Sequence, residues 1–266
     1  MYRAYVLNLA PAHQRLSDME SRLTAAGLPY ERIEAVDGRR LTLPIPEFDE
    51  RRHRLMTGRR PIPAEIGCYL SHLKAVDAFL ATDDTHALIL EDDARFDAGL
   101  PSVIEAALAW STAWDVLRLS TVGRDRVVPV IPLGGGSALG VNFTRTKGAA
   151  AYMLNRRAAR GFARFLRPMR LAYDIAFDLE YLHGLTALAV TPYPVDQRGP
   201  DPSQIQIGIQ GYKLPPWRYL TVFPFRAAVE LARIAMRTTL CARTAARRLT
   251  GPPLPPPAAA GCTRRS

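Results

Sequence analysis

The sequence is poor in cysteine, with only Cys68, Cys241 and Cys262 among its 266 residues. Their odd number and wide spacing match neither a disulfide framework nor a metal-binding cysteine motif, so we expect a reducing compartment. The sequence also lacks any apolar run near the roughly 18 residues that a membrane span needs. Its first residues lead directly into the apolar segment 5–9 without a signal-peptide pattern. We therefore expect a cytoplasmic protein.

Acidic residues are nearly absent from the last fifty positions. Residues 217–266 hold nine arginines, no lysine and a single acid, Glu230, which gives a net charge of +8. The first 216 residues hold 26 basic and 24 acidic residues, a net charge of only +2. A nucleic-acid groove across the main domain would need a basic face of its own, so we expect no nucleic-acid partner.

What the chain does have is an apolar stretch, 87–90, that runs into Glu91, Asp92 and Asp93. Ligands of open α/β sheets bind beyond the carboxyl ends of strands, where these acids should lie. Strand alternation predicts that Glu91 and Asp93 share one face and Asp92 the other. Adjacent carboxylates need a neutralising cation, and hard oxygen ligands suit Mg²⁺ or Mn²⁺. The alternative is an acidic cap on the helix that follows.

Hydrophobic periodicity predicts an α/β domain that opens with a parallel β-α-β unit. The expected strands are 3–9, 30–36, 87–90, 115–119 and 185–190, and the expected helices are 11–26, 65–80, 101–110 and one that ends near 166. Residues 39–63 read as a long connection, and 127–133, broken by two prolines, as edge structure or a loop. The run Gly134–Ser137 predicts a flexible hairpin or lid, because it lacks the spacing and lysine of a phosphate-binding loop.

Two further groups of side chains are candidates for chemistry. Glu65, Cys68 and His72 are spaced three and four apart, so they line one face of a predicted helix. The alternatives are that His72 is a satisfied core residue and that Glu65 only favours the helix N-terminus. Asp174 and Asp178 are also four residues apart and would share a face if that segment is helical.

The C-terminal region predicts a basic amphipathic helix over 224–249, with aromatic residues just upstream. Its expected apolar side is made of Phe225, Val229, Ala232, Met236 and Leu240. Such a helix fits adsorption to an anionic membrane surface. The alternative is a helix that packs on the body and keeps a solvated arginine face. Residues 199–216 read as a linker or wrapping loop, and 251–266 as a disordered tail.

In this order, the motifs resemble glycosyltransferase family 25, the lipopolysaccharide and lipooligosaccharide biosynthesis transferases. The matching pieces are Val6–Leu9 with Arg15, Ala35–Gly38, Glu65–His72, Leu90–Asp93, Gly148–Leu154, Asp174 and Pro194–Gln197. The resemblance covers about residues 3–198, which we expect to form the catalytic domain (1–198), followed by the membrane-associating segment 217–250. The chain departs from the family pattern at Ala10 and at Val76-Asp77.

The resemblance implies a Rossmann-like nucleotide-sugar-binding fold of the glycosyltransferase A type. Asn8, Leu9 and Arg15 would lie by the nucleotide, with Glu91 and Asp92 in the donor site. Asp93, with Glu91, would hold Mn²⁺ or Mg²⁺.

For the reaction, the resemblance implies inverting transfer, which needs a carboxylate base. Asp174 is the first choice, with Asp178 and Glu65 in reserve, while His72 would orient a phosphate or carboxylate. The expected activity is transfer of a hexose, galactose favoured, from a UDP-sugar to a lipid-linked saccharide at the inner face of the cell membrane. Two alternatives remain: a catalytically inactive membrane-surface module with this fold, and a metal-dependent phosphodiesterase, for which the five scattered histidines supply too few ligands.

Overall fold

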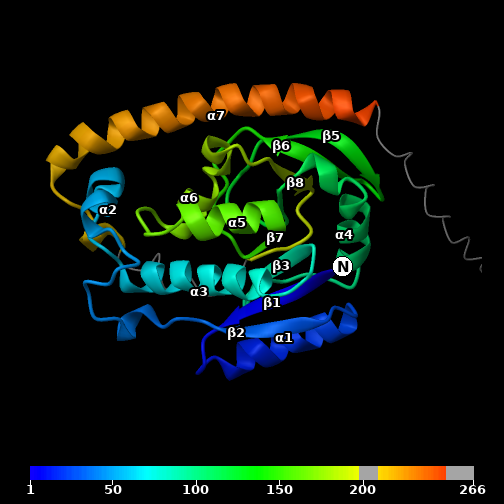
Figure 1. Ribbon diagram of the computed structural model, residues 1–266, viewed down its shortest axis with the longest axis horizontal. Coiled ribbons are helices and arrows are strands. Elements are labelled where there is room, and N and C mark those ends of the chain that lie inside the picture. The colour runs from blue at the N-terminus through cyan, green and yellow to red at the C-terminus, as the bar shows by residue number, and fades with distance from the viewer. Residues whose placement is uncertain (198–208, 250–266) are drawn as a thin grey trace, which may run out of the picture.

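The computed structural model describes residues 1–197 and 209–249 and is built around one eight-stranded sheet (Figure 1). Its strands are β1 (Tyr2–Asn8), β2 (Tyr30–Glu34), β3 (His86–Glu91), β4 (Val116–Arg118), β5 (Val127–Gly134), β6 (Ser137–Asn142), β7 (Ala151–Asn155) and β8 (Ala187–Thr191). Its α-helices are α1 (His13–Ala25), α2 (Glu50–Thr57), α3 (Pro63–Leu80), α4 (Leu100–Leu108), α5 (Arg156–Phe165), α6 (Tyr173–Phe177) and α7 (Tyr219–Arg248).

The strand order is β2-β1-β3-β7-β4-β8-β6-β5. β1 pairs in parallel with β2 on one side and with β3 on the other, as the β-α-β opening predicts. The chain leaves β1 towards β2 and later returns to the opposite side of β1 with β3, so the carboxyl ends of β1 and β3 lie side by side. In an open α/β sheet this reversal is where ligands bind.

Helices cover both faces of the sheet, and the sheet separates the core into two clusters. On one face, α1 and α4 contribute Met19, Leu23 and Ile104 to a cluster with the strands. On the other face, α3 and α5 contribute residues such as Phe79 and Phe162. The all-apolar run of β3 follows from this arrangement, because a central strand is buried on both faces.

Several elements differ from the sequence predictions. The supposed connection 39–63 contains α2, whose N-terminus is capped by Asp49 as its side chain accepts from the Arg52 N–H. β7, in the middle of the sheet, was not predicted, because its residues read as the approach to α5. β5 is an edge strand, which tolerates its two prolines, and it forms with β6 the hairpin expected at Gly134–Ser137.

The C-terminal helix packs on the body, along β5, β6 and α2 (Figure 1). Phe225, Val229 and Ala232 contact the small cluster around Leu171, Leu179 and Tyr181, and Leu240 contacts the main core. The face that we expected to meet a membrane is therefore mostly the face that the body covers. Met236 is the exception, since it remains 45% exposed.

Two arginines of α7 lie inside the protein. Arg233 pairs with Asp178, and Arg237 with Glu180 at 2.5 Å. Arg118 of β4 completes the group, 3.1 Å from Asp178. All five side chains are buried. The alternative expectation, a helix that packs on the body with a solvated arginine face, is right about the packing and wrong about these two arginines. Helical periodicity cannot reveal that the body supplies carboxylates for them.

Within the described ranges, no helix is both long and apolar enough to cross a membrane. Residues 199–208 of the predicted linker and the predicted disordered tail, 251–266, lie outside the described residues.

Candidate functional site

A cavity of about 200 Å³ opens at the carboxyl ends of β1 and β3. Its wall includes five of the predicted site residues: Leu9, Arg15, Glu91, Asp92 and Asp93. His72 reaches the same cavity from α3, together with Cys68. The sheet topology thus brings together side chains that are more than eighty residues apart in sequence.

All three acids of the 91–93 stretch line the cavity. Their contacts agree with the expected division: Asp92 contacts Asn8 and Arg15, whereas Glu91 and Asp93 both interact with Gln197. β3 ends at Glu91, and the two aspartates lie in the turn that follows. The Ala94 N–H donates back to the Glu91 carbonyl at 3.0 Å and helps to hold this turn.

Asp92 is held by donors from the end of β1 and the start of α1. Asn8 Nδ2 donates to its Oδ2 at 2.7 Å, and Arg15 lies 3.1 Å from its Oδ1. Burial raises the pKa of Asp92, while Asn8 and Arg15 oppose that change. Both of its oxygens are thus already bound by side chains of this chain, so Asp92 orders the site.

Asp93, unlike Asp92, has a carboxylate oxygen that no side chain among the described residues binds. Its Oδ1 is buried without a hydrogen-bond partner in the described part of the chain. Burial, followed by the charges of Glu91 and Asp92, raises the pKa of Asp93 to about 7. A carboxylate with one buried, unsatisfied oxygen and two acidic neighbours fits a cation ligand, because a bound cation would satisfy the oxygen and offset the repulsion.

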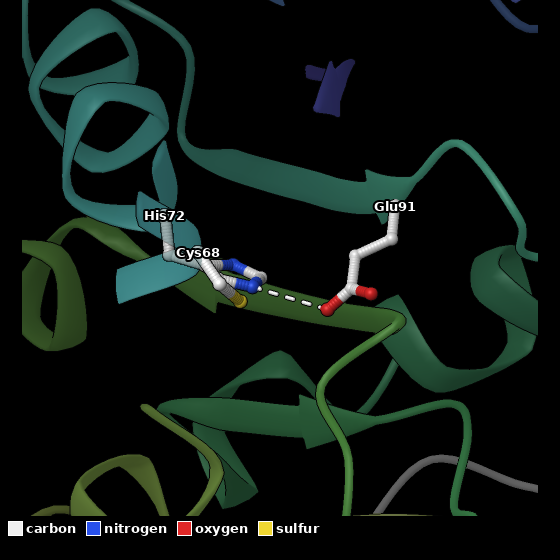
Figure 2. A group of neighbouring side chains, drawn as sticks. All are labelled: Cys68, His72 and Glu91. Atoms are coloured by element: carbon white, nitrogen blue, oxygen red, sulfur yellow. Dashed lines mark hydrogen bonds and ion pairs between the residues drawn. The ribbon is translucent and has the colours of Figure 1, made fainter. Parts of the chain in front are cut away.

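Cys68, His72 and Glu91 converge beside this acid (Figure 2). His72 Nε2 lies 3.2 Å from Glu91 Oε1, and its Nδ1 lies 3.0 Å from the Tyr152 hydroxyl. The imidazole is fully buried and stacks on the Tyr173 ring, with centroids 4.0 Å apart. The prediction that His72 orients a carboxylate agrees with this geometry.

The opposite wall is fixed by close backbone packing between the Val36–Gly38 segment and α3. A Cβ added at Gly67 would lie 2.4 Å from the Val36 carbonyl oxygen, and one at Gly38 only 1.7 Å from the Pro63 carbonyl oxygen. Ser71 Oγ accepts from the Val36 N–H at 2.8 Å. These contacts hold Val36, Asp37 and Gly38 at the cavity edge.

The family model for glycosyltransferase family 25 (LPS biosynthesis protein) matches residues 1–128. This match covers just under half of the chain. The resemblance carried by the sequence motifs is confirmed over this range, which includes β1, α3 and the acidic turn.

Curated relatives carry the same family name. A probable inactive glycosyltransferase 25 family member 3 from Rattus norvegicus is 29% identical over 138 residues, 47% of this chain and 23% of the relative. A glycosyltransferase 25 family member from Drosophila pseudoobscura pseudoobscura is 34% identical over 103 residues, 35% of this chain and 16% of that protein. The matched part therefore spans less than a quarter of either relative.

Two candidate bases, Glu65 and Asp174, do not line the cavity. Glu65, in the first turn of α3, is buried and pairs with Arg59 at 2.9 Å; burial raises its pKa, and Arg59 opposes that rise. Asp174, at the start of α6, is partly exposed and accepts from the Gly148 N–H at 3.4 Å. Its charge raises the pKa of both Glu65 and Cys68, so it acts on the same region.

Asp178 lies elsewhere. It is 1% exposed and belongs to the buried group with Arg118 and Arg233 under α7. Its side chain does not line the cavity, so the reserve role as base does not fit its position. The four-residue spacing misled here because α6 ends at Phe177, so Asp178 lies just beyond the helix.

Sequence reasoning gave no role to Gln197 or Tyr152, although both lie in motifs of the family resemblance. Gln197 Nε2 donates to Glu91 Oε2 at 3.1 Å, so Glu91 is contacted through both carboxylate oxygens. Tyr152 connects His72 to Tyr173 through a hydroxyl pair 2.8 Å apart. The signal available in the sequence was that both residues belong to motifs of the family resemblance. The structure adds that Tyr152 lies in the central strand β7 and that Gln197 follows β8.

Proposed function

We propose that this family 25 chain is a metal-dependent glycosyltransferase that moves a hexose, with galactose favoured, from a UDP-sugar to a lipid-linked saccharide of the lipopolysaccharide type. The observation that carries the proposal is Asp93, with its unpartnered buried oxygen, at the carboxyl end of a strand in a cavity of a family 25 chain. Inversion at the anomeric carbon is part of the proposal.

The donor would lie along the ends of β1 and β3. Leu9 and Arg15 line the cavity beside the acidic turn, and Arg15 supplies positive charge there although it already pairs with Asp92. Asp93 and Glu91 would hold Mn²⁺ or Mg²⁺, since both offer the hard oxygen ligands that these ions prefer. When bound, the ion would act as a Lewis acid towards the charge that develops on the departing UDP.

The chain's own residues would order the remaining groups. Asn8 and Arg15 hold both oxygens of Asp92 at the turn, and His72 with Gln197 fixes Glu91. Asp174 is the proposed general base, because its carboxylate is partly exposed, lies outside the acidic turn, and acts through its charge on Cys68 of the cavity wall. It would take the proton of the acceptor hydroxyl as that oxygen attacks.

The membrane part of the proposal now rests on the outer face of α7. Leu220, Phe223, Leu231 and Ile234 recur at helical spacing and are 80, 56, 70 and 57% exposed. Arg226 and Arg243 are exposed on the same helix. An apolar stripe with flanking arginines fits peripheral binding to an anionic membrane surface, and we propose the inner face of the cell membrane.

The deciding experiment is calorimetric titration of UDP into the purified full chain, with and without Mn²⁺. We expect Mn²⁺-dependent binding that is lost in Asp93→Asn. Asp97→Asn is the matched control, since Asp97 is an exposed acid four residues further on, and it should bind UDP as the wild type does. Absence of UDP binding in the wild type under both conditions would refute the transferase proposal.

The second candidate is an inactive protein that keeps the fold, a possibility raised by relatives that are named as inactive family members. Against it stands the acidic turn, because three repelling carboxylates are costly to keep in a site with no cation to bind. UDP binding without any hydrolysis of UDP-hexoses and without transfer to saccharide acceptors would favour this candidate.

A further inference from the structure

Cys68, His72 and Glu91 form a donor set of a different chemical kind from the carboxylates of the proposed Mn²⁺ site. One sulfur, one nitrogen and one oxygen atom from these side chains all lie within 4.8 Å of one another. Cys68 and His72 are one turn apart on α3 and point towards the end of β3, where Glu91 faces them (Figure 2). Two rigid elements therefore position the three atoms.

We propose that Cys68, His72 and Glu91 bind a thiophilic divalent cation of the zinc class. Thiolate and imidazole ligands favour Zn²⁺ over Mg²⁺ or Mn²⁺, whereas carboxylates alone do not. A tetrahedral zinc ion with ordinary bond lengths keeps its ligand atoms about 3.4–3.7 Å apart. The 3.2 Å between His72 Nε2 and Glu91 Oε1 is close to that spacing, and the Cys68 sulfur lies within 4.8 Å of both atoms, so side-chain movement of about an ångström would complete the geometry.

The surroundings of the imidazole favour coordination through Nε2. Its Nδ1 faces the Tyr152 hydroxyl at 3.0 Å, and that hydroxyl continues to the Tyr173 hydroxyl at 2.8 Å. A metal-bound histidine normally donates its other ring N–H to such an outer partner, which fixes the tautomer and the ring orientation. The Tyr173 ring stacks on the imidazole at an interplanar angle of 4°, which fixes the orientation of the imidazole plane.

The local charge also favours a cation. Burial raises the pKa of the Cys68 thiol, and the negative charges of Glu91, Asp174, Glu65 and Asp93 add to that rise. Binding would form bonds from zinc to Sγ, Nε2 and a Glu91 oxygen, and the thiol proton would pass to solvent. All three residues line the cavity, so a fourth position is open to water, as in zinc sites that are not closed by four protein ligands.

The inference is independent of the proposed transfer reaction, because it needs neither nucleotide nor acceptor. Its consequence is a competition: zinc would take Glu91 from the proposed Mn²⁺ site. Failure of UDP binding leaves the zinc measurement unaffected, and the reverse also holds, so the two proposals can fail separately.

The test uses Co²⁺ as a spectroscopic substitute for Zn²⁺ in the purified full chain. We expect a thiolate-to-cobalt charge-transfer band that saturates at one equivalent and disappears when Zn²⁺ is added. The control is Cys241→Ser with Cys262→Ser, which leaves Cys68 as the chain's only thiol and should keep the band. Cys68→Ser should remove the band, and His72→Gln should weaken Co²⁺ binding by at least about tenfold.

Absence of the band in the wild type would overturn the proposal. So would its survival in Cys68→Ser, or its loss in the Cys241→Ser, Cys262→Ser protein. Circular dichroism of the metal-free variants checks their folding. If Cys68→Ser or His72→Gln does not fold, the comparison between the wild type and the double-serine control still decides which thiol binds the metal.

Discussion

Asn8 and Asp92 join the ends of two neighbouring strands through one short hydrogen bond. Asn8 Nδ2 donates to Asp92 Oδ2 at 2.7 Å, and the same amide also donates to the Ala12 carbonyl at 3.1 Å. Asn8 therefore couples the end of β1 and the start of α1 to the acidic turn after β3. The middle acid of the turn is held by the protein, and Asp93 remains the acid with a buried oxygen to offer.

Removing this amide should weaken the proposed donor site. In Asn8→Ala, Asp92 loses its closest donor, so its pKa should rise further and the turn should lose its orientation. We expect UDP affinity in the presence of Mn²⁺ to fall roughly tenfold, comparable to the loss of a supporting hydrogen bond around a metal site, because the neighbouring residue Asp93 would lose its fixed position. Calorimetry measures the change, and Gln14→Ala, an exposed change nearby, should have no effect. Equal affinities of Asn8→Ala and wild type would contradict this role.

The sequence predicted the acidic site better than it predicted the C-terminal helix. The run 87–90 suits a buried strand, and the end of such a strand is where Glu91 and Asp93 were expected to lie. In α7, both the side with Phe225 and Val229 and the side with Leu231 and Ile234 have helical spacing. Periodicity therefore predicts the helix but not the side that packs.

Contacts between distant segments account for the other differences. The carboxylates that receive Arg233 and Arg237 come from a part of the chain about fifty residues earlier. The contact between Gly38 and Gly67 depends on the backbone path, and a glycine in a sequence does not say what approaches it. Asp178 was misassigned for the same reason, since its partners are contributed by β4 and α7.

The buried pair between Arg237 and Glu180 should be important for stability. Arg237→Met leaves Glu180 in an interior site where, among the described residues, its remaining ion-pair partner is Arg118, 3.5 Å away. Breaking a buried pair in this way costs about 3–5 kcal/mol. Urea denaturation should show a matching loss in the free energy of unfolding. The control is Arg243→Met at an exposed position of the same helix, expected to change stability by less than about 0.5 kcal/mol. A loss under 1 kcal/mol in Arg237→Met would show that α7 is not tied to the body through this pair.

His53 should make the fold sensitive to acid. It is fully buried in α2 against Phe48, and burial, then the charges of Arg59 and Arg54, lower its pKa to about 4 from an ordinary value of 6.5. Between these values the unfolded chain binds a proton that the folded chain does not, so stability falls as the pH drops from 6.5 towards 4. The full loss would be about 3 kcal/mol.

The measurement is the free energy of unfolding as a function of pH. His53→Leu should have a flatter profile than the wild type between pH 6.5 and 4, because the variant has no proton to gain there. His13→Gln, at an exposed histidine, should keep the wild-type slope. Parallel profiles for His53→Leu and wild type would rule out His53 as the source.

Gly67→Ala should disturb the cavity wall. The new methyl group would lie 2.4 Å from the Val36 carbonyl oxygen and 2.9 Å from Gly38 Cα, so α3 and the Val36–Gly38 segment must move apart. Overpacking of this kind costs about 1–3 kcal/mol, which thermal unfolding would detect. Gly211→Ala is the matched control, because its added methyl meets no atom within 4 Å. Unchanged stability in Gly67→Ala would mean that the wall adapts without cost.

The outer stripe of α7 offers a cleaner test of membrane binding than removal of the whole tail. Deleting residues 217–266 would also strip Asp178 and Glu180 of their buried arginines, so lost binding could reflect a damaged body. Leu231→Ser with Ile234→Ser changes only exposed side chains, 70 and 57% accessible. Since each apolar side chain contributes on the order of 1 kcal/mol or more when buried in the interface, partitioning onto anionic phospholipid vesicles should fall at least about tenfold.

The control for this pair is Thr238→Ser with Thr239→Ser, which alters two exposed polar residues of the same helix and should partition as the wild type does. Binding should also weaken as salt is raised, because the arginines act through screened charge. Equal partitioning of the Leu231, Ile234 variant and the wild type would show that the stripe does not meet the lipid. Any binding would then have to come from the arginines alone. Neutral vesicles separate the contribution of the arginine charge from that of the apolar stripe, and they should bind the wild type weakly.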